Sequence, residues 1–292
     1  MLRRVSWVSC AFLVFYAVGA MPAAALEIQG HRGARAARPE NTLPAFEHGL
    51  EVGADVLELD LLVTRDDQLV IGHDPILNPE ICLDPSGKPL AGEVLVRSLR
   101  LEELQRYDCG SLRHPRFPRQ VLVPKTKMPT LSELFALVRA RKDAARVRFN
   151  VEIKSVPGRP ELGPPPEAFA KLLVDLLAKE KMSAQVVVQS FDHRTLREVH
   201  RLNKDLAISA LTSDNYLDYV AIARGLGAKI ISPDQLWITA EAVKELHAAG
   251  VRVIPWTANS EAEWARLIGL GVDGIITDDP EGLRRYLSAR RP

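Results

Sequence analysis

The 292-residue chain has few cysteines, few aromatic residues and almost no net charge. It holds three cysteines, 6% aromatic residues and a formal net charge of +1. It has no basic stripe or run of like charges, which argues against nucleic acid as a partner. Its long apolar run, residues 5–20, is shorter than the ~20 residues that a membrane-spanning helix needs. We therefore expect neither a nucleic-acid-binding protein nor a stable membrane anchor.

Residues 1–25 are predicted to be a secretory signal peptide. Arg3 and Arg4 precede the apolar run, and the small residues 23–25 follow it at a position suited to cleavage. A membrane anchor is the alternative, which the length of the run disfavours. We expect a mature chain that begins at Leu26 and is secreted, with the periplasm as its compartment.

Export affects the interpretation of the cysteines. Cys10 lies within the signal peptide, so Cys82 and Cys109 remain in the mature chain. Two cysteines in one loop-rich stretch of an exported protein are typical of a disulfide, because the compartment is oxidising. Two free buried thiols are the alternative.

Short apolar runs alternate with amphipathic helical patterns along the mature chain, and this alternation predicts a parallel sheet covered by helices. With residues 69–72 counted as a hairpin on the second strand, eight β/α units follow, which predicts a (β/α)₈ TIM barrel over residues 26–292. A doubly wound open sheet is the alternative, although no G-x-G-x-x-G turn follows the first strand. The expected strands are residues 27–31, 56–64, 147–153, 185–189, 206–211, 228–231, 251–256 and 273–277.

Residues 75–129 interrupt the alternation. They contain eight prolines and both mature cysteines and show no long periodic segment. A structureless loop of this size is improbable in a compact domain unless it has a function or folds on itself. We therefore predict an inserted loop-rich subdomain or lid after the second strand.

Carboxylates face one side of two predicted strands. Glu58 and Asp60 are two residues apart and share a face, and Glu152 and Lys154 repeat the pattern. A salt bridge to Lys154 would neutralise one of the three carboxylates, but not all of them. One divalent cation, Ca²⁺ or Mg²⁺, prefers oxygen ligands and accounts for the set better.

Two of the seven histidines lie at strand ends beside the carboxylates. His31 and His73 are candidates for general base and general acid, because histidine exchanges protons near neutral pH. Zinc binding by both is the alternative. Arg32 is suited to bind two oxygens of a phosphate. The remaining histidines are expected at the surface or in packing: His48, His114, His193, His200 and His247.

The order and spacing of short motifs carry a family resemblance that spans nearly the whole mature chain. The sequence resembles the glycerophosphodiester phosphodiesterase family, and in particular its secreted bacterial members. The matching motifs are His31-Arg32-Gly33, Pro39-Glu40-Asn41-Thr42, Glu58-x-Asp60, Gly72-His73-Asp74, Glu152-Ile153-Lys154, Gln189-Ser190-Phe191, Trp256-Thr257-x-Asn259 and the run from Asp273 to Asp278.

The resemblance implies a TIM barrel with an insertion after the second strand. It also implies hydrolysis of small glycerophosphodiesters, such as glycerophosphocholine, to sn-glycerol 3-phosphate and an alcohol. By the same resemblance, roles are assigned as follows: Glu58, Asp60 and Glu152 bind the metal, His31 and His73 perform acid–base catalysis, Arg32 and Lys154 contact phosphate, and Trp256 and Phe191 line the substrate groove.

Several alternatives stay open at this point. The nucleophile is either water or the neighbouring glycerol hydroxyl, which would give a cyclic phosphate, and either histidine can be the base. An aldolase-like barrel would use Lys154 as a Schiff-base nucleophile. An exported binding protein would hold phosphodiesters without cleaving them, and a lysophospholipase D would act on a lipid. The sequence does not specify the head group, the metal or the oligomeric state.

Overall fold

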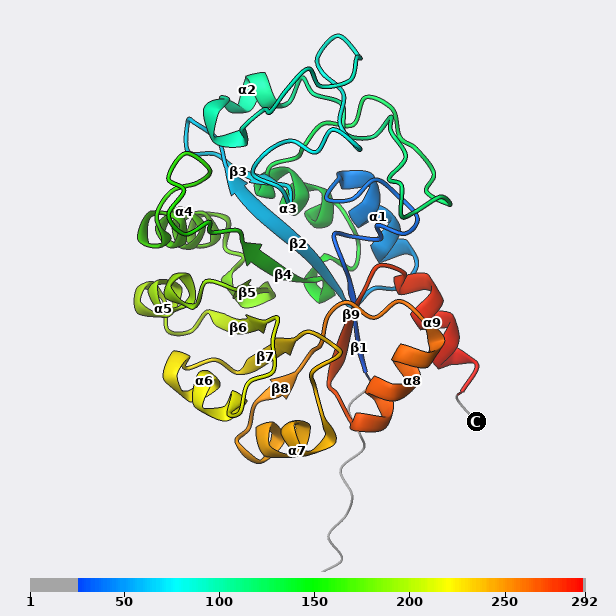
Figure 1. Ribbon diagram of the computed structural model, residues 1–292, viewed down its shortest axis with the longest axis vertical. Coiled ribbons are helices and arrows are strands. Elements are labelled where there is room, and N and C mark those ends of the chain that lie inside the picture. The colour runs from blue at the N-terminus through cyan, green and yellow to red at the C-terminus, as the bar shows by residue number, and fades with distance from the viewer. Residues whose placement is uncertain (1–25, 291–292) are drawn as a thin grey trace, which may run out of the picture.

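The strands of the computed structural model, which describes residues 26–290, form one nine-stranded sheet (Figure 1). Along the sheet the order is β8-β7-β6-β5-β4-β2-β1-β9, and neighbours in this order run parallel. The strands are β1 (Glu27–Gly30), β2 (Val56–Val63), β3 (Leu69–Ile71), β4 (Arg148–Ile153), β5 (Val186–Ser190), β6 (Ala207–Thr212), β7 (Ile230–Pro233), β8 (Arg252–Val253) and β9 (Gly274–Thr277). The predicted signal peptide, with Cys10, lies outside the described residues.

Hydrogen bonds between the two ends of the sheet bring it round into a barrel. Asp273 N–H donates to Val253 O at 2.9 Å and Ile276 N–H donates to Pro255 O at 3.0 Å, so β9 lies beside β8 and the residues after it. The short strand β3 lies outside the ring and pairs antiparallel with β2, as the hairpin prediction required. The TIM-barrel prediction is therefore confirmed, and the doubly wound alternative is wrong.

Helices follow the parallel strands and cover the outside of the barrel (Figure 1). Capping boxes begin α3, with Thr130 and Glu133, and α8, with Ser260 and Glu263. The helices are α1 (Leu43–Glu51), α2 (Leu101–Leu104), α3 (Leu131–Arg139), α4 (Pro166–Glu180), α5 (His193–Leu202), α6 (Tyr219–Leu226), α7 (Ala240–Ala248), α8 (Glu261–Leu270) and α9 (Pro280–Ser288), with 3₁₀ turns η1 (Val96–Ser98), η2 (Ala144–Arg146) and η3 (Ser183–Gln185). No helix within residues 26–290 is long and apolar enough to cross a bilayer.

Strand β2 separates the helix-facing core from the barrel interior. Leu57, Leu59 and Leu61 are fully buried in the main hydrophobic cluster, which also holds residues of the covering helices. Each such leucine contributes roughly 1.5–3 kcal/mol by its burial. Because successive side chains alternate, Glu58 and Asp60 point to the opposite side of the strand. The predicted facing of β2 is confirmed.

The observed strands differ from the predicted ones by one or two residues at most ends, and the largest difference is at β8. Regular pairing of β8 is limited to two residues rather than residues 251–256, because Pro255 has no N–H to donate. Backbone bonds nevertheless continue the same path, with Trp256 N–H donating to Pro233 O at 3.0 Å. Helix α6 begins at Tyr219, because the Asp218 side chain accepts from the Ala221 N–H and caps the helix there.

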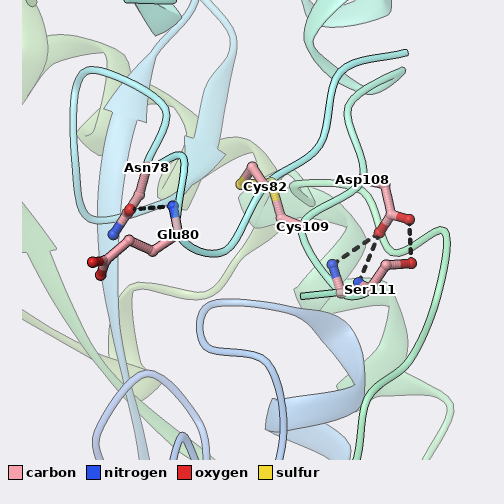
Figure 2. The surroundings of a disulfide bond; sticks show 7 residues. Asn78, Glu80, Cys82, Asp108, Cys109 and Ser111 are labelled. Carbon is pink, nitrogen blue, oxygen red and sulfur yellow. Dashed lines mark hydrogen bonds between the residues drawn. A yellow bond between two sulfur atoms is a disulfide. The ribbon is translucent and has the colours of Figure 1, made fainter. Parts of the chain in front are cut away.

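Residues 75–129, here called the β3–α3 segment, hold only η1 and α2 as regular helical structure. A second, smaller hydrophobic cluster joins this segment to β2 and β3: Leu62, Val70, Leu77, Cys82, Val96, Leu104, Cys109 and Met128. A disulfide joins Cys82 to Cys109, as Figure 2 shows, so this prediction is confirmed. The segment leaves and rejoins the barrel at one place, because Ile71 N–H donates to Pro129 O at 2.7 Å.

Candidate active site

Three carboxylates meet at the carboxyl ends of β2 and β4. Asp60 and Glu152 are paired across these neighbouring strands, and Glu58 lies two residues before Asp60. One oxygen from each of the three side chains lies within 4.8 Å of the others. All three residues are buried, with at most 6% of their surface exposed. The barrel therefore brings three carboxylates close enough for one oxygen of each to contact a single metal ion.

Neighbouring donors orient two of the carboxylates, Glu58 and Asp60. Glu58 accepts from the Arg32 backbone N–H at 3.0 Å and from Gln189 Nε2 at 2.8 Å. Asp60 accepts from Asn41 Nδ2 at 2.8 Å. These bonds come from the loop after β1 and from β5, so two parts of the chain outside β2 and β4 set the geometry of the cluster.

Burial and mutual repulsion disfavour the charged forms of these carboxylates, and a bound cation would relieve both effects. Burial and the charges of Asp60 and Glu152 raise the pKa of Glu58 well above its usual range. Burial also raises the pKa of Glu152 to about 8, against the opposing charge of Lys154. Burial acts in the same direction on Asp60, but Arg32 and Lys154 outweigh it and hold the pKa of Asp60 well below its usual range. Clustered carboxylate oxygens are the ligands that Mg²⁺ and Ca²⁺ prefer, so the residues fit a divalent metal ion.

The sharp turn after β1 depends on glycine. Gly33 has φ +89°, a left-handed conformation, and a Cβ atom there would lie 2.6 Å from the Ala45 backbone carbon of α1. A Cβ atom on Gly30 would lie 2.0 Å from the Gly33 carbonyl oxygen. This close packing of backbone on backbone turns Arg32 toward β2, where its N–H reaches Glu58.

His31 is held by an aspartate from the end of the barrel. Its Nδ1 lies 2.6 Å from Asp278 Oδ1, and its Nε2 lies 4.0 Å from Glu58 Oε2. Burial lowers the pKa of His31, although the charge of Asp278 acts against this shift. The histidine is thus oriented with Nε2 toward the carboxylate cluster and favours its neutral form.

His73 has a comparable but more open arrangement. It follows β3, and its Nδ1 lies 2.7 Å from Asp74 Oδ1. About a third of its side chain is exposed, against 14% for His31. Each histidine therefore has one ring nitrogen bonded to a carboxylate, which leaves Nε2 of each ring as the atom available for proton exchange.

Two arginines in the loop after β1 share one buried glutamate. Arg32 lies 2.5 Å from one oxygen of Glu40, and Arg35 lies 2.6 Å from the other. Arg32 also lies 3.2 Å from Asp60. The β3–α3 segment supports this loop, because Gln120 Nε2 donates to the Arg35 carbonyl at 2.6 Å. The guanidinium groups are consequently held in place before any ligand arrives.

A cavity of about 310 Å³ joins these groups at the carboxyl end of the barrel. Phe191 and Trp256 lie in its wall with their rings edge to face and 5.3 Å between centroids. Asp60 does not line the cavity but belongs to the carboxylate cluster behind it. The other predicted site residues all line it: His31, Arg32, Glu58, His73, Glu152, Lys154, Phe191 and Trp256.

Comparisons with known proteins agree with this arrangement. Residues 31–282 match the model of the glycerophosphoryl diester phosphodiesterase family. The chain belongs to this family, whose members are hydrolases. A glycerophosphodiester phosphodiesterase of Caldanaerobacter subterraneus is 32% identical over 257 residues, which cover 87% of this chain and 94% of the relative.

Solved structures of phosphodiesterases share the fold. A crystal structure of a putative glycerophosphoryl diester phosphodiesterase from Silicibacter pomeroyi has a TM-score of 0.85 and 30% identity, covering 92% of this chain and 95% of that one. A phosphodiesterase of Oleispira antarctica, solved with its product sn-glycerol-3-phosphate, has a TM-score of 0.74 and 22% identity over 90% of this chain and 96% of that one. The latter similarity concerns the fold.

Sequence reasoning gave no role to several residues of this phosphodiesterase site. Asp278, Arg35 and Glu40 hold the histidine and the arginines, and Arg116 reaches the cavity from the β3–α3 segment. Asp278 follows the last strand, and a polar residue at that end of a barrel strand is a usable signal. Nothing in the sequence marks Arg116, because its position depends on how the β3–α3 segment folds.

Among the histidines expected in surface or packing positions, His114 lies nearest the site. It is 6% exposed, and its Nε2 is 3.9 Å from Glu40 Oε2 and 3.5 Å from Arg35. It thus packs against the buried arginine pair and does not line the cavity. The other four also lie outside the cavity lining: His48, His193, His200 and His247.

Proposed function

We propose that this chain hydrolyses glycerophosphodiesters to sn-glycerol 3-phosphate and an alcohol, with His31 and His73 exchanging the protons. The observation that supports this most strongly is that one cavity joins the three-carboxylate cluster to two histidines, His31 and His73. Each histidine is oriented by a hydrogen bond to an aspartate. A small phosphodiester is the substrate that uses all of these groups at once. Membership of a hydrolase family supports this proposal.

Glu58, Asp60 and Glu152 would hold one divalent cation, Ca²⁺ or Mg²⁺. When bound, the cation would supply positive charge for the phosphate oxygens. Arg32 and Lys154 would contact the same phosphate, because both already lie beside the cluster, with Lys154 Nζ 3.0 Å from Glu152. Preorganised cations of this kind stabilise charge that develops in the transition state.

His31 is suited to take a proton from the nucleophile, which is either water or the neighbouring glycerol hydroxyl. Its burial lowers its pKa, so the neutral ring predominates near neutral pH, and its bond to Asp278 leaves Nε2 as the accepting atom. Asp278 is a positioning residue that also stabilises the imidazolium once it forms. His73, which is more exposed and bonded to Asp74, would donate a proton to the leaving alcohol.

The Schiff-base alternative is disfavoured by the surroundings of Lys154. Burial lowers the pKa of Lys154, but the charges of Asp60 and Glu152 outweigh it and raise that pKa overall. A Schiff-base lysine must be neutral to attack a carbonyl. Lys154 therefore serves better as a permanent cation than as a nucleophile. A role in binding alone is disfavoured because the family is one of hydrolases.

We also propose that residues 1–25 are removed on export and that the mature enzyme works in the periplasm. It would be a single barrel domain with an insertion at residues 75–129. The basic start, apolar run and small residues before Leu26 support this. The confirmed Cys82–Cys109 disulfide fits an oxidising compartment. Mass spectrometry of the protein recovered from a periplasmic extract tests the cleavage, and an intact N-terminus on the exported chain would contradict it.

The activity is tested by glycerol 3-phosphate release from several glycerophosphodiesters. We expect release that EDTA abolishes and that added Ca²⁺ or Mg²⁺ restores. A lysophospholipid with the same head group is the arm that detects lysophospholipase D activity. Absence of hydrolysis of every diester in the presence of both cations would refute the proposed function.

Histidine variants test the mechanism. His31→Ala and His73→Ala should each lower kcat by at least about a hundredfold, the usual contribution of a general acid or base. His48→Ala is the matched control, because His48 lies on α1 and does not line the cavity. Near-normal kcat in either cavity variant would exclude that residue from proton transfer.

A further inference from the structure

The outer wall of the cavity contains an arginine that the mechanism above does not use. Arg116 belongs to the β3–α3 segment and lines the same cavity as His31 and Lys154. Its backbone N–H donates to His114 Nδ1 at 3.1 Å, and its guanidinium carbon lies 5.7 Å from the centre of the Phe117 ring. The β3–α3 segment, rather than a barrel strand, thus brings this positive charge to the site.

Arg116 forms no ion pair with any residue between 26 and 290, whereas the other cations of the cavity wall do. A guanidinium that no carboxylate of the protein neutralises is available to an anionic ligand. The paired cations are Arg32 and Arg35, which both contact Glu40, and Lys154, which contacts Asp60 and Glu152.

Arg116 is exposed, whereas the carboxylate cluster is buried, so Arg116 lies toward the mouth of the cavity that it lines. Burial is the main cause that lowers the pKa of Arg35 and of His114, and the positive charge of Arg116 adds a smaller lowering to both. The positive charges that act most strongly on the cluster are instead those of Arg32 and Lys154. A phosphate bound at the cluster would therefore leave Arg116 facing the part of the substrate that extends outward.

We propose that Arg116 selects the leaving alcohol by its charge, binding an anionic substituent and disfavouring a cationic one. This inference rests on the proposed hydrolysis of glycerophosphodiesters. Within such substrates the glycerol is neutral and the phosphodiester is common to all, so the alcohol is the part whose charge varies. A carboxylate or phosphate substituent matches the planar donor fork of arginine, whereas a quaternary ammonium group is repelled by it.

The aromatic pair in the same cavity is the competing selector. Phe191 and Trp256 have ring faces that can attract a cationic alcohol such as choline. Their edge-to-face contact at 5.3 Å, however, places the edge of one ring against the face of the other and so occupies one of these faces. The unpaired charge of Arg116 is the stronger influence on an alcohol at the mouth.

The experiment measures kcat/KM for three glycerophosphodiesters, whose alcohols are 3-hydroxypropanoate (anionic), glycerol (neutral) and choline (cationic). The enzyme is the full mature chain saturated with Mg²⁺ or Ca²⁺. The variants are Arg116→Gln, which removes the charge, and Arg116→Lys, which keeps it. Arg119→Gln is the matched control, because Arg119 is exposed in the same segment but does not line the cavity.

We expect the wild type to favour the anionic over the cationic substrate by about fivefold, which is what one partly exposed ion pair supports. Arg116→Gln should remove this preference, Arg116→Lys should retain part of it, and Arg119→Gln should retain all of it. Raising the ionic strength should weaken the preference of the wild type and leave Arg116→Gln unaffected, because salt screens exposed charges.

Three outcomes would overturn the proposal while leaving the proposed hydrolysis intact. They are an unchanged preference in Arg116→Gln, an equal loss for all three substrates, which would mean that Arg116 contacts the phosphate, and a choline preference in the wild type. Failure of the wild type to cleave any diester would instead refute the proposed function, and this inference with it.

Discussion

The barrel and the β3–α3 segment reach a defined structure by different physical means. In the barrel, parallel strands hydrogen-bond to their neighbours around a ring, and fully buried leucines and phenylalanines fill the space under the helices. In the β3–α3 segment regular structure is nearly absent, and a disulfide with a small apolar cluster replaces it. The barrel holds the carboxylate cluster, whereas the segment contributes Arg116 to the wall of the cavity.

This difference indicates a division of labour. Groups that must be placed precisely, such as the carboxylates of β2 and β4, project from strands whose register is fixed on both sides. Arg116, which lies on a loop, is suited to a contact that tolerates movement. The predictions that follow test whether chemistry and stability divide between the two regions in this way.

The largest expected effect is loss of activity when the barrel carboxylates are neutralised. Asp60→Asn and Glu152→Gln should each lower kcat/KM by about a thousandfold, because each removes a carboxylate that we propose as a ligand of the charge-stabilising metal ion. Calorimetric titration should show weaker Ca²⁺ or Mg²⁺ binding in both variants. Glu51→Gln, on the exposed surface of α1, is the control that should keep wild-type activity. Full activity of either cluster variant would remove the barrel from the chemistry.

The next effect concerns the β3–α3 segment. Replacement of both Cys82 and Cys109 by serine should lower the free energy of unfolding by about 3–4 kcal/mol, because the disulfide closes a loop with a sequence separation of 27. Hydrogen exchange should accelerate in residues 75–129 much more than in β2. Equal acceleration in both regions would show that the segment and the barrel unfold as one unit.

A pH dependence should distinguish the metal-free barrel from the metal-bound one. Burial raises the pKa of Glu152 from 4.5 to about 8, so the folded state holds a proton that the unfolded state releases at lower pH. The metal-free protein should consequently lose stability, on the order of 3 kcal/mol, as pH rises from about 5 to about 8. Urea unfolding in EDTA at several pH values measures the slope, and saturating Mg²⁺ or the Glu152→Gln variant should flatten it. A metal-free protein that gains stability over this range would contradict the assignment.

The smallest effect concerns the contact between the two regions. Gln120 is 3% exposed and donates to the carbonyls of Arg35 and Arg38. Gln120→Ala should cost about 1–2 kcal/mol in stability, because it leaves buried carbonyls without a partner. Thermal melts check this, with Gln68→Ala in the exposed β2–β3 turn as the control. An unchanged melting temperature would mean that the segment rests on the barrel without this link.

The sequence alone predicted the barrel and most of the polar residues that line the cavity, because both depend on local pattern. Alternation in β2 identifies which side chains face inward, and polar residues at strand ends indicate the mouth of a barrel. The partners of these residues could not be predicted in the same way. Asp278 lies 247 residues from His31, and only closure of the ring brings the two together. Strand β8 was predicted at residues 251–256 and is shorter than that, because its hydrophobic run continues past Pro255, which cannot donate a backbone hydrogen bond.

The place where the β3–α3 segment leaves and rejoins the barrel has a further consequence. Ile71 N–H bonds to Pro129 O, and a bridge joins Val70 to Thr130, so the two ends of the excursion lie beside each other on strand β3. A loop whose ends already meet can change its length at little cost in free energy. The β3–α3 segment can therefore be replaced by one of another length or sequence, in evolution or by design. Such a replacement would change the entrance to the cavity and leave the barrel strands intact.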